Sequence, residues 1–175
     1  MTDDDILFEP TPIPDHLDPV IIAGISDDDL ESALLGYVVA RLKELDGEAQ
    51  ALAAIPSVLR AWYITFVVDG EVLNGGFNQL FFNGSAGASP EAPQAFETVG
   101  LSEGADLIRR ARILLKDRGP VLEDAREEGT IQAFMETYDG DPFAQLDAAY
   151  AEREDEFRTG RIRFLRQHAN SIRHP

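Results

Sequence analysis

The sequence predicts an all-α fold, a compact multi-helix bundle preceded by an acidic, proline-rich N-terminal arm. Apolar residues recur at spacings of three and four along most of the chain, which is the period of an amphipathic helix. Capping and helix-ending residues separate these periodic segments. The chain has 175 residues, of which 44% are hydrophobic, and can therefore bury a core without cross-links. We expect residues 1–25 to form the arm, partly docked on the bundle, and residues 26–175 to form a single helical domain.

Proline and capping residues mark the arm and the first two helices. Prolines prevent the arm from forming one helix; they are Pro10, Pro12, Pro14 and Pro19. The apolar residues of the arm suggest docking, and Val20-Ile21-Ile22 could form a short strand. Ser26 is a natural N-cap for a helix that Asp46-Gly47 ends. A short helix over residues 48–55 precedes Pro56.

The segment from Ser57 to about Asp69 is the most apolar predicted helix, and we place it at the centre of the fold. Asn74-Gly75-Gly76-Phe77 predicts a tight turn into a short helix. That helix should end at Asn83-Gly84 with a left-handed cap. After a loop, Pro90 predicts the start of another helix, which Gly100 closes.

The remaining helices differ in charge. Ser102 starts a helix with a basic outer face, and Gly119-Pro120 should end it. A short acidic helix over 121–128 follows, ending near Gly129, and then helices over 131–138 and 143–156. The last predicted helix, over 155–172, contains Arg158, Arg161, Arg163 and Arg166, and Arg173 follows it. These two basic helices depart from a uniformly negative surface.

Net charge favours some classes of partner and argues against others. The chain has 32 Asp and Glu against 15 Lys and Arg, which gives a formal net charge of -17. Such a field repels nucleic acid and anionic membranes and attracts basic proteins. The N-terminus has neither the basic nor the apolar region of a signal peptide. We therefore expect a soluble, cytoplasmic, acidic protein-binding module that binds neither nucleic acid nor membranes directly. The alternative is a protein that is acidic without binding any particular partner through its charge.

Motifs for catalysis, metals and cofactors are missing from the sequence. It has no cysteine, and none of its three histidines, His16, His168 and His174, stands in a metal-binding pattern. The glycine-rich pieces fit neither of the common nucleotide-binding loops. Paired carboxylates are abundant, but their runs predict a hydrated surface and not a pocket that tunes a pKa. We expect no enzyme activity, no catalytic residue, no metal and no cofactor.

A cluster of amides follows the central helix. Asn74, Asn78, Gln79 and Asn83 lie among phenylalanines, so some of these amides should be buried and hydrogen-bonded. We interpret them as residues that pin the turn after the central helix. The alternative is a small-ligand site or an enzyme pocket that Tyr63 would complete.

The run from Asn74 to Gly84, preceded by Glu71-Val72-Leu73, resembles the signature of the DNA-mimic protein family, small acidic bacterial proteins otherwise described as a domain of unknown function. The matching residues are Asn74, Gly75, Gly76, Phe77, Gln79, Phe81 and Asn83. The resemblance is clear over about residues 34–118. It implies a compact helical domain, a homodimer, and surface carboxylates that imitate duplex DNA and occupy the DNA-binding face of a basic regulator. The signature itself is mainly structural, so it predicts the fold better than the function.

Mimicry of DNA requires carboxylates from several helix ends to converge on one face, since neighbours on one helix are about 5–6 Å apart. The candidate acidic face combines two groups: Asp27, Asp28, Asp29 and Glu31 with Glu123, Asp124, Glu127 and Glu128. The run from Glu152 to Glu156 is an alternative. A third possibility for function is a dimeric accessory or immunity-type partner that does not imitate DNA.

Overall fold

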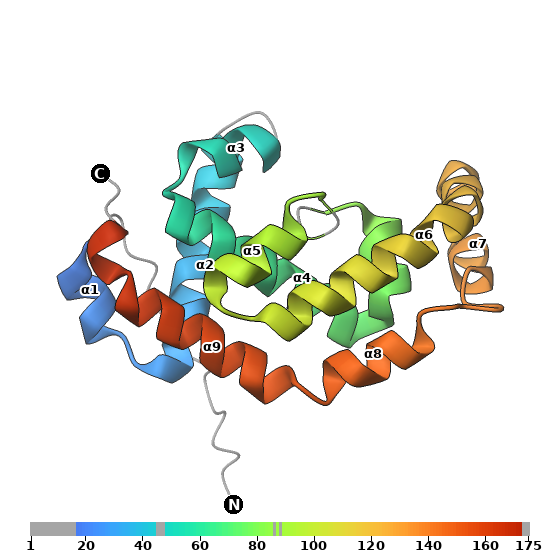
Figure 1. The fold of residues 1–175 in the computed structure, drawn as a ribbon. Coiled ribbons are helices and arrows are strands. Elements are labelled where there is room, and N and C mark those ends of the chain that lie inside the picture. Colours follow the sequence, from blue (N-terminus) through green and yellow to red (C-terminus); the bar gives the residue numbers. More distant parts are fainter. Residues whose placement is uncertain (1–16, 45–47, 86, 88, 173–175) are drawn as a thin grey trace, which may run out of the picture.

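The computed structural model of the chain describes residues 17–44, 48–85, 87 and 89–172, and this part forms an all-α bundle (Figure 1). The predicted fold class is confirmed. In chain order the elements are α1 (Pro19–Gly24), α2 (Asp27–Glu44), α3 (Glu48–Ala54), α4 (Ser57–Asn83), α5 (Ala92–Val99), α6 (Ser102–Glu128), α7 (Ile131–Glu136), α8 (Ala144–Ala151), α9 (Glu154–Gln167) and the short 3-10 helix η2 (Ala169–Ser171). Residues 1–16 of the predicted arm and the predicted helix end at Asp46-Gly47 lie outside the described residues. Within the described ranges, no helix combines the length and apolarity needed to cross a membrane.

α4 lies at the centre of the bundle, as the sequence predicts. It contacts α5, α6, α8 and α9, and its Trp62 is completely buried. Aromatic rings extend this core beyond α4. The ring centroids of Phe77 and Tyr150 are 5.9 Å apart, and those of Tyr150 and Phe157 are 4.9 Å apart. Phe96 packs edge-on against Phe157, so the aromatic core joins α4, α5, α8 and α9.

Local capping explains where the first two helices begin. The Asp18 carboxylate accepts hydrogen bonds from the backbone amides of Val20 and Ile21 at 2.7 and 2.9 Å, and Pro19 stands in the first turn of α1. The predicted short strand at Val20-Ile21-Ile22 is therefore wrong, because these cap contacts favour a helix. The Ser26 hydroxyl accepts from the Asp29 amide at 3.2 Å, which confirms the predicted N-cap of α2.

α6 continues through Gly119-Pro120, where the sequence predicts that it ends. Pro120 removes one helical hydrogen bond, but its φ is compatible with a helix and the residue lies on the exposed side. Beyond it, Leu122 and Ala125 are buried and continue the inner face that Ile108 begins. Packing of this face outweighs the local signal for a break. Gly129, at φ 69°, then caps the helix as expected.

The predicted helix over residues 143–156 is divided at Glu152 and Arg153, so α8 and α9 meet earlier than expected. The backbone amide of Arg153 donates to the Tyr150 carbonyl at 3.0 Å, and the Phe157 amide donates to the Arg153 carbonyl at 2.9 Å. The change of direction between the two helices is visible in Figure 1. It allows Tyr150 and Phe157 to enter the same aromatic core.

Candidate functional site

The signature residues Asn74 to Phe77 lie at a kink inside α4, where the sequence predicts a tight turn. Gly75 has φ -153° and ψ 25°, and Gly76 has φ 70° and ψ -177°, a conformation that is open almost only to glycine. Two adjacent glycines change the direction of the chain without a loop, and the helix resumes at once. The short helix that follows is confirmed, with Phe77 and Phe81 buried and Gly84 in a left-handed cap.

Asp147 of α8 caps the helix that resumes after the kink. Its Oδ1 accepts a hydrogen bond of 2.8 Å from the backbone amide of Phe77, the first residue after the two kink glycines. A Cβ atom at Gly76 would lie 2.5 Å from Asp147 Oδ2, so the carboxylate also needs glycine at this position. Partial burial raises the pKa of Asp147, and the hydrogen bond from Phe77 opposes that rise. Sequence reasoning missed Asp147, because it is 70 residues from Phe77 along the chain.

The amides of the signature hydrogen-bond within the protein. Glu71 Oε2 accepts from Gln79 Nε2 at 2.8 Å and from Asn83 Nδ2 at 2.7 Å, so one carboxylate joins both sides of the kink. Asn74 Nδ2 donates to Gln79 Oε1 at 3.0 Å. These hydrogen bonds join side chains on the two sides of the kink, as a structural role for the amides would require. Tyr63 lies about 16 Å along the helix from Asn74, so the two side chains do not lie side by side.

Two further contacts tie the kink to α7. Asn78, which is completely buried, donates from Nδ2 to Thr137 Oγ1 at 2.7 Å. The Tyr138 hydroxyl donates to the Gly75 carbonyl at 3.0 Å. The kinked segment of α4 therefore fixes the position of the residues that follow α7.

Two of the charged residues that were expected on the surface are buried and form an ion pair with each other. Arg161 of α9 is 1% exposed and Glu31 of α2 is 8% exposed. Arg161 Nε donates to Glu31 Oε1 at 2.7 Å, and its Nη2 donates to Asp69 Oδ2 at 3.0 Å. Glu31 therefore does not belong to the acidic face, and Arg161 does not belong to the basic face of the last helix.

Neutral donors complete this internal cluster. Trp62 Nε1 donates to Glu31 Oε1 at 2.9 Å, and the Tyr150 hydroxyl donates to Asp69 Oδ1 at 3.3 Å. Burial alone would lower the pKa of Arg161, but the hydrogen bonds and negative charges of Glu31 and Asp69 outweigh it and raise that pKa. Burial, together with the charge of Asp69, raises the pKa of Tyr150 well above its ordinary value. The cluster connects α2, α4, α8 and α9 and is structural.

The acids at the start of α2 are exposed but form ion pairs with arginines of α9. Asp27 pairs with Arg166 at 2.6 Å, and Asp28 pairs with Arg158 at 3.3 Å. All three aspartates stand in the first turn of the helix, where the helix dipole stabilises negative charge. The arginines of α9 thus neutralise part of this group.

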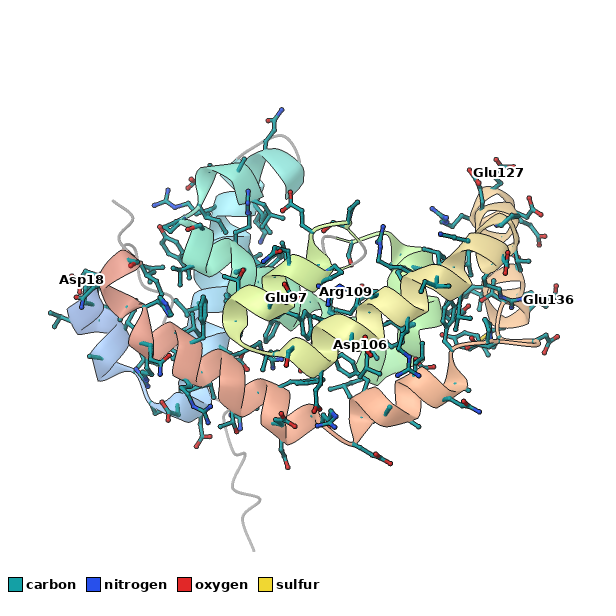
Figure 2. All side chains as sticks on the ribbon, in the orientation of Figure 1. Asp18, Glu97, Asp106, Arg109, Glu127 and Glu136 are labelled. Atoms are coloured by element: carbon teal, nitrogen blue, oxygen red, sulfur yellow. The ribbon has the colours of Figure 1, made fainter. Side chains whose placement is uncertain are left out.

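The second acidic group is different. Glu123, Asp124, Glu127 and Glu128 are all exposed at the C-terminal end of α6. None of them has a cationic partner among the ion pairs of the described ranges, and Glu128 accepts only a hydroxyl hydrogen bond from Thr130. Figure 2 shows Glu127 and Glu136 at one end of the molecule, pointing away from it. We call residues 121–139 the α6–α7 tip.

The two acidic groups do not share a face. α2 begins beside α1 and α9, and the α6–α7 tip lies at the opposite end of the bundle (Figure 1). The predicted face that combined both groups is therefore corrected to two separate surfaces. The remaining run, Glu152 to Glu156, lies at the junction of α8 and α9, where Arg153 pairs with Glu156 at 2.9 Å and also with Glu103.

Two open grooves border α9, with volumes of about 490 and 470 Å³, and both include Thr159, Arg163 and Gln167. The signature amides line neither of them. Among the residues that the structure describes, no three His, Asp or Glu side chains are grouped to hold a metal ion.

Comparison with protein families identifies one match. Residues 53–168, more than half of the chain, match the model of the family described as DMP19-like protein. No curated protein and no solved structure matches the chain. The matched stretch contains the kink of α4 and the α6–α7 tip but not the acids at the start of α2. The chain belongs to the DMP19-like protein family.

Proposed function

We propose that this protein binds a basic DNA-binding protein in place of duplex DNA, and that the α6–α7 tip is the surface that does so. The observation that carries the proposal is the placement of the tip acids. They are exposed, they lack cationic partners in the described part of the chain, and they occupy positions where negative charge weakens a helix.

Helix electrostatics separates this group from the acids of α2. Glu127 and Glu128 occupy the last turn of α6, where the negative end of the helix dipole repels a carboxylate. Glu123 and Glu127 are four residues apart, as are Asp124 and Glu128, so each pair repels across one helical turn. These charges therefore oppose the helix that carries them. A binding role explains why they are present, because surfaces used for function often oppose stability.

The tip also has the charge that a basic surface requires. Within residues 121–139 the chain carries Glu123, Asp124, Glu127, Glu128, Glu136 and Asp139 against one basic residue, Arg126. A partner that binds DNA by neutralising phosphates presents lysines and arginines that can meet such a cluster. The family resemblance points to the same class of partner and implies a homodimer.

We expect charge removal to affect stability in opposite directions at the two acidic groups. The tip variant Glu123→Gln/Asp124→Asn/Glu127→Gln/Glu128→Gln should unfold with a free energy about 1 kcal/mol higher than that of the native chain. The α2 variant Asp27→Asn/Asp28→Asn/Asp29→Asn should lose about the same amount, since it loses the dipole interaction and its ion pairs. Urea denaturation measures both, and about 1 M salt should reduce both differences. A tip variant that is less stable than the native chain would contradict our account of these acids.

Affinity capture with matched baits tests the function. The native chain, the tip variant and the junction variant Glu152→Gln/Glu154→Gln/Asp155→Asn/Glu156→Gln lose none, four and four charges respectively. Each bait is exposed to lysate of the source organism at about 50 mM and about 500 mM salt, and retained proteins are identified by mass spectrometry. Circular dichroism confirms that each bait is folded.

We expect the native and junction baits to retain the same basic DNA-binding protein at low salt and to release it at high salt. The tip bait should not retain it, and duplex DNA should displace it from the native bait. Equal retention by the tip bait would refute the α6–α7 tip as the binding surface. If only the junction bait fails to retain the partner, the binding surface lies at the start of α9 and not at the α6–α7 tip. Sedimentation of the native bait alone tests the homodimer.

A further inference from the structure

Two large apolar side chains lie on the exposed face of α7, beside Gln132 and Glu136. Ile131 is 84% exposed and Met135 is 58% exposed. They are four residues apart on one helix and therefore lie on the same side of it. Val121, also in the α6–α7 tip, is 40% exposed. Large apolar side chains gathered on a short exposed helix are typical of a contact surface.

Contacts on the opposite side of α7 keep these side chains exposed. Phe134 packs against Phe82 of α4 with ring centroids 4.6 Å apart. Thr137, 1% exposed, accepts the hydrogen bond from Asn78 and is held through its carbonyl by Arg118. Turning Ile131 and Met135 inward would break all of these contacts. The exposure of Ile131 and Met135 is therefore fixed by the fold and does not result from loose packing.

Acidic residues surround the apolar face. Glu127 and Glu128 end α6 just before it, and Glu136 is the next residue after Met135. Glu136 is oriented along the helix by a hydrogen bond of 2.8 Å from Gln132. Arg126 is the one basic residue of residues 121–139, and its Nε donates to the Leu122 carbonyl. An occupant of this surface must therefore offer apolar side chains at its centre and positive charges around them.

We infer that the α6–α7 tip binds a basic amphipathic α-helix of its partner, with Ile131 and Met135 against the apolar face of that helix and its lysines or arginines against Glu127, Glu128 and Glu136. The inference rests on the proposed function and narrows it, since DNA has phosphates but offers no apolar helix face. An amphipathic helix presents apolar residues every three or four positions with basic residues beside them, which matches this arrangement. The flexible Met135 side chain can adapt to such a surface.

Two synthetic peptides of about 18 residues test the inference, because that length can form a helix. Both carry the same lysines; one has leucines along one face, and the other has glutamine in place of each leucine. Binding is measured by fluorescence anisotropy at about 50 mM and about 500 mM salt. The proteins are the native chain, Ile131→Gln/Met135→Gln, the tip variant and the control Val20→Gln. Val20 is 80% exposed on α1, at the other end of the molecule.

We expect the native chain to bind the leucine peptide about tenfold more tightly than the glutamine peptide, since each apolar contact adds affinity. Ile131→Gln/Met135→Gln should lose this preference and keep the salt dependence, and Val20→Gln should change neither. If Ile131→Gln/Met135→Gln binds the leucine peptide as tightly as the native chain, the inference is wrong. Weaker binding of both peptides by the tip variant would then still support the acidic surface. If the tip variant binds both peptides like the native chain, the proposed function itself fails.

Discussion

Replacing Arg161 with methionine is expected to lower the free energy of unfolding by about 3 to 5 kcal/mol. The change removes the one cation that faces two buried carboxylates, Glu31 and Asp69. Two negative charges would then remain in the interior, facing the neutral donors Trp62 and Tyr150. Urea denaturation followed by circular dichroism measures the loss.

Two further variants separate burial from charge. Arg158→Met also removes an arginine of α9 from an ion pair, but its side chain is 47% exposed and its partner Asp28 is 92% exposed. We expect a loss of less than about 1 kcal/mol from this control. The triple variant Glu31→Gln/Asp69→Asn/Arg161→Met keeps acceptors for Trp62 and Tyr150 without buried charge, and should recover most of the stability. If Arg161→Met loses no more free energy of unfolding than Arg158→Met, the internal cluster does not stabilise the fold.

Replacing Gly76 with alanine is expected to lower the free energy of unfolding by about 3 kcal/mol. A Cβ atom at φ 70° and ψ -177° is strained, and it would also displace the Asp147 carboxylate that caps the helix after the kink. Thermal and urea denaturation both measure the effect.

Gly70 provides the matched control, because it also lies in α4 but has open space around its Cβ position and no positive φ. Gly70→Ala should raise stability by about 0.5 to 1 kcal/mol, since alanine favours a helix interior. A Gly76→Ala variant that behaves like Gly70→Ala would show that the kink does not need glycine.

Local signals predicted much of the fold. Ser26, Gly84 and Gly129 mark helix ends by chemistry that operates within a few residues, and the structure has caps at all three. Where the prediction failed, at Pro120, the deciding factor was the burial of Leu122 and Ala125 against other helices. That packing depends on the tertiary structure, and proline alone does not reveal it.

The charged core was the larger failure, and the sequence did contain a signal for it. Arg161 stands four residues after Phe157 and three before Phe164, on the apolar side of its helix. Glu31 likewise precedes Leu34 by three residues. A charged residue at an apolar position of a helix indicates a buried partner. Which residues pair cannot be deduced in this way, because Glu31 and Arg161 are 130 residues apart.

The acids of the candidate face stay a prediction, but the structure separates the two groups that the sequence analysis combined and places Glu31 in the interior. The sequence places Asp27 at a helix start and Glu127 at a helix end, but only the fold shows that arginines of α9 pair with Asp27 and Asp28. The apolar residues of α7 were assigned to a helix, but their exposure depends on which side packs against Phe82.

The kink of α4 also has a consequence for the geometry of recognition. Asn78 and the Gly75 carbonyl hold Thr137 and Tyr138, so the kinked segment of α4 positions a surface to which it contributes no side chain. A substitution at Asn78 would change the orientation of the α6–α7 tip relative to the bundle, although no acidic or apolar residue of the tip would itself be changed.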